Sequence, residues 1–326
     1  MTVGLLGDVM LGRQVARALG ERSPERVWSG ELADLCRSCD ALVCNLECCI
    51  SERGRPTERI PGKPFFFRAP PTPAVEALAA VGTAAVSLAN NHALDYEEEA
   101  LLDTLEHLSA AGIASAGGGE EVDRARRGTV VEAGDARLGL LAATDHPAEY
   151  AAGEETPGVA FADLRSEFPA WIRAELSRLR DEADLVLAFP HWGPNMATEP
   201  ARWQRERARE LIAAGADLVA GHSAHVFHGV GMAGERPVLF DLGDALDDYR
   251  VDRRRRNDLG LLALWSPEAE REIELVGLTL GYCETGLARG KDADWIAARL
   301  QKACAALDTR VERVDEQRFA VGRATS

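Results

Sequence analysis

The sequence lacks the excess of basic residues that a nucleic-acid-binding face requires. Its 37 lysines and arginines stand against 53 aspartates and glutamates, which gives a formal net charge of -16 at pH 7. Binding to a phosphate backbone depends on clustered Lys and Arg, so nucleic acid is not the expected partner. A small phosphorylated substrate is still compatible with this charge, because a bound metal ion inverts the local electrostatics.

The sequence also lacks an apolar run that approaches the ~20 residues of a membrane span. Its first residues, MTVGLLGDVMLGR, carry no charged n-region and resemble a buried strand rather than a signal peptide. We therefore expect no contact with a membrane and a cytoplasmic location.

A second cysteine pair of the kind found in zinc knuckles is missing. Five of the seven cysteines fall in one stretch: Cys36, Cys39, Cys44, Cys48 and Cys49. Cys36 and Cys39 have the CxxC spacing, but no second CxxC or HxxxH follows at the distance that zinc sites use. We interpret these residues as small buried hydrophobes in a reducing compartment.

What the sequence does contain is an alternation of apolar runs and helical segments. Strands are predicted at 3–7, 41–44, 83–89, 129–131, 138–143, 185–189, 218–220 and 238–240. Helices are predicted at 11–19, 72–81, 96–111, 168–182, 203–214 and 292–308. This alternation indicates an α/β architecture with buried sheets.

No convincing linker interrupts the chain. We expect one domain over residues 1–250 and a C-terminal extension, 251–326, packed on the same domain. The stretch 51–71 is rich in Pro, Arg and Gly and is predicted to be a long ordered loop near the site. Its basic side chains would focus an anion toward the site if they face it.

Polar side chains follow five of the predicted strands. Ligands gather at the carboxyl ends of strands in α/β sheets, and these ends carry carboxylate, amide or imidazole groups: Asp8; Asn45 and Glu47; Asn90, Asn91 and His92; His191; His222 and His225. A single histidine at a strand end is more often structural, but four of the seven histidines at matching positions are harder to explain as packing. Mixed oxygen and nitrogen ligands suit Mn, Fe, Zn or Co, and a carboxylate shared by two ions is typical of dinuclear hydrolases.

These motifs resemble those of the CapA family, also called the PgsA or poly-γ-glutamate capsule synthesis family, within the calcineurin-like metallophosphoesterase superfamily. The matching stretches are GDVMLGR (7–13), NLE (45–47), SLANNHALDY (87–96), HWG (191–193), GADLVAGHSAHV (215–226) and LFDLGD (239–244). The resemblance implies a four-layer α/β/β/α sandwich with two divalent metal ions, Mn, Fe or Zn, at the strand ends.

The resemblance also implies a role for each matching residue. Asp8 would bind the first metal, Glu47 would bridge, and Asn91, His191 and His222 would bind the second, with His225 returning to the first. His92 would donate a proton to the leaving group. Asp95 would hold the far side of that imidazole, and Arg13 would meet an anionic substrate oxygen.

Three positions depart from expected patterns. Metallophosphoesterases usually have a histidine where this chain has Met10, a feature that the CapA family shares and that leaves the first metal short of a ligand. Ser223 replaces a histidine in the GHSAH motif, which leaves open which imidazoles reach metal, and Asp244 stands where the family has asparagine. Asp244 is either a further ligand or a turn residue, and the turn is the favoured reading. His228 is a further candidate for the pocket.

The favoured function is a dinuclear metal-dependent hydrolase of a phosphate ester or similar small anionic substrate. Metal-activated water would attack, and His92 would act as general acid. One alternative is a non-catalytic accessory protein of poly-γ-glutamate or capsule synthesis. Another is a metal-dependent hydrolase of γ-glutamyl amide bonds. The absence of a Gly-Lys-Ser/Thr nucleotide loop favours hydrolysis over synthesis. Substrate, native metal and oligomeric state stay open.

Overall fold

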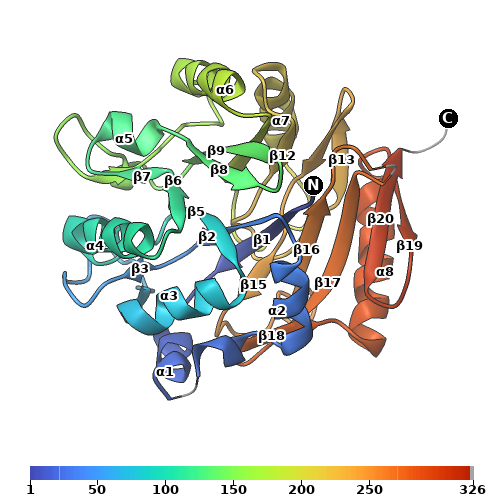
Figure 1. The fold of residues 1–326 in the computed structure, drawn as a ribbon, viewed down its shortest axis with the longest axis horizontal. Coiled ribbons are helices and arrows are strands. Elements are labelled where there is room, and N and C mark those ends of the chain that lie inside the picture. The colour runs from blue at the N-terminus through green and yellow to red at the C-terminus, as the bar shows by residue number, and fades with distance from the viewer. Residues whose placement is uncertain (22, 270, 324–326) are drawn as a thin grey trace.

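Two β-sheets form the centre of the protein in a computed structural model that describes residues 1–21, 23–269 and 271–323 (Figure 1). The larger sheet has ten strands, in the order β19-β20-β17-β16-β1-β2-β5-β6, with β15 beside β1 and β18 beside β17. Its strands are β1 (Val3–Val9), β2 (Ala41–Leu46), β5 (Thr83–Ser87), β6 (Ala114–Ala116), β15 (Asp244–Leu246), β16 (Leu259–Trp265), β17 (Ile273–Gly281), β18 (Glu284–Leu287), β19 (Thr309–Arg313) and β20 (Arg318–Arg323).

The smaller sheet has six strands, in the order β13-β14-β12-β11-β9-β8. Its strands are β8 (Thr129–Ala133), β9 (Ala136–Thr144), β11 (Leu185–His191), β12 (Leu218–Ala220), β13 (Val230–Ala233) and β14 (Arg236–Leu239). The four central strands run parallel. Two short ribbons pair β3 (Cys49–Ile50) with β4 (Arg68–Ala69) and β7 (Gly118–Gly119) with β10 (Gly158–Val159).

The helices are α1 (Arg13–Glu21), α2 (Gly30–Arg37), α3 (Pro71–Ala80), α4 (Glu97–Ala110), α5 (Val122–Arg126), α6 (Ala170–Glu182), α7 (Arg202–Ala213) and α8 (Gly290–Ala305), with 3-10 turns at Pro24–Val27 and Ala148–Tyr150. Helices α1–α4 cover the outer face of the larger sheet and α6 and α7 that of the smaller one, whereas α8 packs into the core between the sheets. One core joins the larger sheet to α1–α4, a second lies between the sheets, and a third joins the smaller sheet to α6 and α7. These three cores confirm the predicted four-layer α/β/β/α sandwich.

Alternation along each strand divides its side chains between two cores. Leu5 of β1 packs between the sheets and Leu6 packs under the helices, and Val43 and Leu42 of β2 divide in the same way. Successive strand residues point to opposite faces. Because both faces are buried, the strands appear in the sequence as continuous apolar runs.

The predicted strands and helices are present, with their ends moved by a few residues. The pattern did not predict α2, which begins after Ser29, whose side chain accepts a hydrogen bond from Leu32 N–H. For the chain after residue 250 it predicted only a closing helix, whereas the structure also has five strands there. The first of them, β16, pairs antiparallel with β1 and so completes the sheet that carries the site. No helix of the described residues is long and apolar enough to cross a membrane.

Candidate metal centre

The carboxyl ends of the parallel strands of both sheets meet at one edge of the sandwich. Asp8 lies near the end of β1, and Asn45 lies one residue before the end of β2. From the smaller sheet, His191 ends β11, and His222, two residues after β12, pairs with it through an isolated bridge. Side chains from two separate sheets are therefore brought to one buried point.

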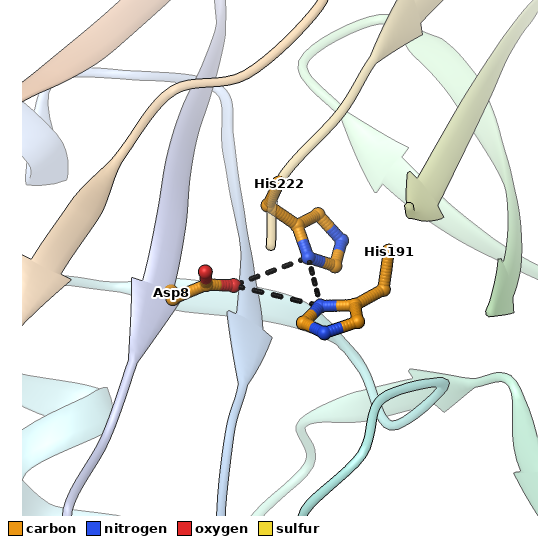
Figure 2. Close-up of side chains that lie close together, drawn as sticks. All are labelled: Asp8, His191 and His222. Carbon is orange, nitrogen blue, oxygen red and sulfur yellow. Dashed lines mark hydrogen bonds and ion pairs between the residues drawn. The ribbon is translucent and has the colours of Figure 1, made fainter. Parts of the chain in front are cut away.

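Asp8, His191 and His222 form the first group that could hold a metal ion (Figure 2). Nδ1 of His222 lies 2.9 Å from Nδ1 of His191 and 3.1 Å from Oδ1 of Asp8, and Nδ1 of His191 lies 3.8 Å from the same oxygen. Metal–ligand bonds of 2.0–2.2 Å place neighbouring ligand atoms ~3–3.5 Å apart. The three atoms thus have nearly the mutual spacing of ligands around one cation.

Asp8, His225 and Asp244 form a second such group. Nδ1 of His225 lies 2.8 Å from Oδ1 of Asp244 and 3.6 Å from Oδ2 of Asp8. All three residues are buried. The two groups share Asp8, one carboxylate oxygen facing each, so the donor set suits two cations beside one aspartate.

The backbone around these ligands is held in uncommon conformations. Ser223 and His225 have positive φ angles of 112° and 58°, a region that costs free energy for residues other than glycine. Ser223 N–H donates to Oδ2 of Asp8 at 3.1 Å, and Nδ2 of Asn45 donates to Oδ1 at 2.8 Å. These contacts fix both oxygens of the shared carboxylate.

Three buried side-chain oxygens of predicted ligand residues and of Asp244 have no hydrogen-bond partner among the described residues. They are Oε1 of Glu47, Oδ1 of Asn91 and Oδ2 of Asp244. Buried polar groups are nearly always paired, so each exception calls for an explanation. Oxygen atoms in this condition, together with the imidazole nitrogens of the two groups, are what divalent Mn, Fe or Zn would coordinate. The residues present therefore fit two such ions.

The electrostatics of the cluster also favour bound cations. Burial and the charge of Asp8 raise the pKa of Glu47 well above its usual value, and burial and Asp247 do the same for Asp244. Burial would also raise the pKa of Asp8, but its hydrogen bond to His222 and the charge of that histidine lower it. Carboxylates concentrated in this way need positive charge beside them to stay ionised together.

His92 and Asp95 form a buried pair beside this cluster. Nδ1 of His92 lies 2.6 Å from Oδ2 of Asp95, and the ring of Phe67 stacks on the imidazole at 3.9 Å between centroids. Burial lowers the pKa of His92 to about 4. Asp95 also accepts hydrogen bonds from Phe67 N–H at 2.7 Å and from the Tyr150 hydroxyl at 3.3 Å. The imidazole is consequently fixed in one orientation, with Nδ1 committed to Asp95.

A pocket of about 420 Å³ opens over His92 and His225. Its other lining residues are Arg13, Phe65, Phe67, Asn195, Met196, Tyr249, Arg250 and Asn257. Arg13 lies over the rings of Phe65 and Phe67, and its guanidinium forms an ion pair with Asp248 at 3.1 Å. The arginine predicted to meet an anionic oxygen thus lies at the pocket with a protein carboxylate already beside it.

The loop 51–71 lies against the site, but its cations do not line the pocket. Arg53 pairs with Asp103, and Arg59 pairs with Glu97 and Glu98. Lys63 donates to Asn91 O at 2.7 Å and lies 3.0 Å from Oδ1 of Asp95. Arg53 and Arg59 therefore attach the loop to α4, and Lys63 attaches it to the His92–Asp95 pair. The sequence analysis had expected these cations to focus an anion if they faced the site, and they do not line the pocket.

The predicted residues fall into three situations. Asp8, His191, His222 and His225 converge, while Glu47 stays outside both metal-ligand groups and accepts a hydrogen bond from the Tyr249 hydroxyl at 3.2 Å. Oδ1 of Asn91 is buried and has no hydrogen-bond partner among the described residues. The division of ligands between two metals, with Glu47 as the bridge, stays a prediction. His228, whose Nε2 donates to Ala197 O at 2.9 Å, belongs to neither group.

The structure changes the interpretation of three residues that the sequence analysis had considered. Asp244, interpreted as a turn residue, is buried within β15 in parallel register with Asp8. Asn90 is structural, because its Nδ2 donates to Leu46 O at 2.8 Å and its Oδ1 accepts from His92 N–H. Lys63 was seen only as one of several loop cations. Nothing in the sequence around Lys63 indicates that its ammonium group lies beside Asp95.

The chain is similar to a family of capsule synthesis proteins, to two named relatives and, in fold, to a solved structure. The family model described as bacterial capsule synthesis protein PGA_cap matches residues 2–249. A protein of Mycobacterium tuberculosis named probable polyglutamine synthesis accessory protein is 31% identical, over 95% of this chain and 93% of its own length. The PGA biosynthesis protein CapA of Bacillus subtilis is 24% identical, over 79% of this chain and 66% of its own. A phosphatase of Mycoplasma pneumoniae, among solved structures, aligns with a TM-score of 0.46 at 12% identity, over 85% of this chain and 86% of its own.

Proposed function

The chain belongs to the bacterial capsule synthesis protein family PGA_cap. We propose that it is a hydrolase that uses two divalent metal ions. Its substrate would be a phosphate ester or a similar small anion. One observation carries the proposal: two metal-ligand groups share Asp8 directly beneath a pocket lined by His92. The oxygen and nitrogen donors favour Mn, Fe or Zn.

Bound at these two groups, divalent cations would supply an activated water and neutralise charge on the substrate. The protein's own residues then do the rest. Asn45 and Ser223 N–H fix the two oxygens of Asp8, so the ligands of both groups keep one geometry. Phe65, Phe67 and Tyr249 line one part of the pocket with aromatic rings.

His92 is the proposed proton donor to the leaving group. Its Nδ1 is held by Asp95, and its ring lines the pocket, which leaves Nε2 for the substrate. Burial keeps the free imidazole neutral, and an anionic substrate beside the ring would favour its protonated form. Proton donation would then follow substrate binding. Arg13, 3.1 Å from Asp248, would exchange that partner for a substrate oxygen.

The experiment measures metal content of the purified protein by elemental analysis, together with turnover of an aryl phosphate monoester and diester. We expect close to two equivalents of Mn, Fe or Zn, and a His191→Ala/His222→Ala variant should lose at least the metal of the first group, and turnover with it. His107→Ala on α4 is the matched control and should lose neither. Absence of metal binding after loading with each ion would refute the enzyme proposal.

A second candidate is an accessory role in polymer synthesis without catalysis. The name of the mycobacterial relative, probable polyglutamine synthesis accessory protein, supports it. The two candidates separate in the same experiment. Metal without turnover of either ester would favour the accessory role or a substrate with a γ-glutamyl amide bond, and release of glutamate from a γ-glutamyl peptide would decide between those two.

We also propose a cytoplasmic location. The chain has seven cysteines, and six of them are buried, with no disulfide assigned to any of them among the described residues. Cysteines outside disulfides in this number are typical of a reducing compartment. A fluorescent fusion of the full chain, compared with a periplasmic marker after cell fractionation, tests the location.

A further inference from the structure

A second pocket, of about 190 Å³, lies apart from the metal centre. One side is formed by Thr198, Glu199 and Pro200, which precede α7, and the other by the last turns of α8 and the two residues that follow it. Much of its surface is apolar and comes from Pro200, Ala303 and Leu307. An apolar cavity of about 150 Å³ is enough to bind benzene, so this pocket can hold the body of a small organic molecule.

Three cations line the same pocket. They are Arg205 of α7 and Arg299 and Lys302 of α8. Within the described residues none of the three forms an ion pair, although acidic residues outnumber basic ones across the chain by 53 to 37. The pocket's one carboxylate, Glu199, is exposed. The lining thus carries a local excess of positive charge on a strongly acidic protein.

Arg299 is held in place before any ligand arrives. Its Nε and Nη2 donate to Phe227 O at 3.1 and 2.8 Å, and its guanidinium lies over the rings of Phe227 and Trp295. The side chain is half-buried. Asp241 interacts favourably with this charge from a distance but forms no ion pair with it. A positive charge that is partly removed from water without an ion pair costs free energy, which a bound anion would offset. A fixed guanidinium also loses little conformational freedom on binding.

The wall of this pocket continues into the active-site pocket. Asn195 and Met196 line the pocket over the metal centre, and Thr198 to Pro200 line the second one. The segment between them is attached at two points: Met196 N–H donates to Ala224 O at 2.8 Å, and Ala197 O accepts from His228. A molecule in the second pocket would therefore contact the same short segment that borders His225.

We propose that this second pocket is a binding site for a small organic anion: a carboxylate or phosphate group carried on an apolar body about the size of a benzene ring. The apolar floor takes the body, and Arg205, Arg299 and Lys302 meet the anionic group. The site needs no metal ion and is independent of the proposed hydrolysis.

The test is a ligand-observed NMR titration of the full chain with benzoate and with phenylphosphonate. Metal is first removed with a chelator, and the chelator is dialysed away, so that neither probe can bind through a metal ion. We expect saturable binding of both anions. Benzamide, which has the same body without the charge, should bind at least about tenfold more weakly.

Charge reversal locates the binding. Arg205→Glu/Lys302→Glu should weaken the binding of both anions by at least about tenfold, while Arg209→Glu, on α7 outside the pocket, should not. Neither Arg205 nor Lys302 makes an ion pair in the described structure, so thermal unfolding without ligand should be nearly unchanged. The proposal fails if neither anion binds, if the double variant binds like the unaltered protein, or if binding is lost instead in His191→Ala/His222→Ala.

Discussion

Nδ1 of His191 and Nδ1 of His222 lie 2.9 Å apart in the interior, and both face Oδ1 of Asp8. Two imidazole nitrogens approach this closely when one donates its N–H to the other or when both coordinate a shared cation. Burial and the charge of His222 lower the pKa of His191 well below its ordinary value. His191 is therefore neutral in the metal-free protein, which is the form in which an imidazole binds a metal ion.

Removal of metal should destabilise the protein. Binding to the folded state alone stabilises by about 3 kcal/mol when the free metal is at 100 times Kd, and for a chain of this size that corresponds to a fall in Tm of roughly 5–10 °C on chelation. Calorimetry with and without chelator measures the shift. In His191→Ala/His222→Ala, which lacks the ligands of the first group, the chelator should have a smaller effect. Equal shifts in both proteins would mean that the metal binds elsewhere.

Asp244→Asn should lower the metal content from two equivalents to about one. The substitution removes the charge of the second group while the first, Asp8 with His191 and His222, keeps all its ligands. Because Asp244 is buried and hydrogen-bonded to His225, Asn preserves the shape and isolates the charge. Elemental analysis gives the stoichiometry, and Asp163→Asn on the surface is the control. Two equivalents retained in Asp244→Asn would contradict the second group.

The sequence predicted Asp8, His191 and His222 at strand ends, because ligands gather at the carboxyl ends of parallel strands. That the ends of two separate sheets meet at one point was implied only by the family resemblance. The sequence could not predict the place of Asp244. The dipeptide Gly243-Asp244 has the composition of a turn, and only the parallel pairing of β15 with β1, more than two hundred residues apart in sequence, sets Asp244 opposite Asp8.

The cations of loop 51–71 show a second limit of the sequence. Their number and spacing were compatible with an anion funnel, but a solvent-facing arginine and one that pairs with a neighbouring helix have the same local sequence. The acidic first turn of α4 decided the outcome for Arg59. Lys63 contacts Asp95, and this contact depends on the three-dimensional path of the loop, which the local sequence does not reveal.

His92→Ala should reduce turnover by about 10²–10⁴-fold, the range for loss of a general acid, while metal content stays near two equivalents. The loss should depend on the leaving group. An aryl ester with a strongly acidic phenol needs little protonation, so it should be hydrolysed with a smaller defect than an alkyl ester. Comparing kcat/KM across a series of leaving groups tests this. A uniform defect across the series would assign His92 to substrate binding instead.

Lys63→Met should destabilise the protein by about 3–5 kcal/mol, because it leaves the buried carboxylate of Asp95 without its cationic partner. A double-mutant cycle with Asp95→Asn isolates the pair: the double variant should be less destabilised than the sum of the single ones. Urea unfolding gives the free energies. Arg202→Ala, which breaks an exposed ion pair with Glu206, should cost less than ~1 kcal/mol. Strict additivity would show that Lys63 and Asp95 do not stabilise each other.

His228 should make the metal-free protein less stable in acid. Burial lowers its pKa from the ordinary 6.5 to about 4, so between these values the unfolded chain binds more protons than the folded one, and stability falls as the pH falls. The difference corresponds to about 3 kcal/mol between pH 8 and pH 4. His228→Phe cannot be protonated, and although it loses the hydrogen bond to Ala197 at every pH, its stability should decline less steeply over this window. Urea unfolding at intervals from pH 8 to pH 4 measures both slopes, and parallel slopes would show that the imidazole titrates alike in the folded and unfolded chains.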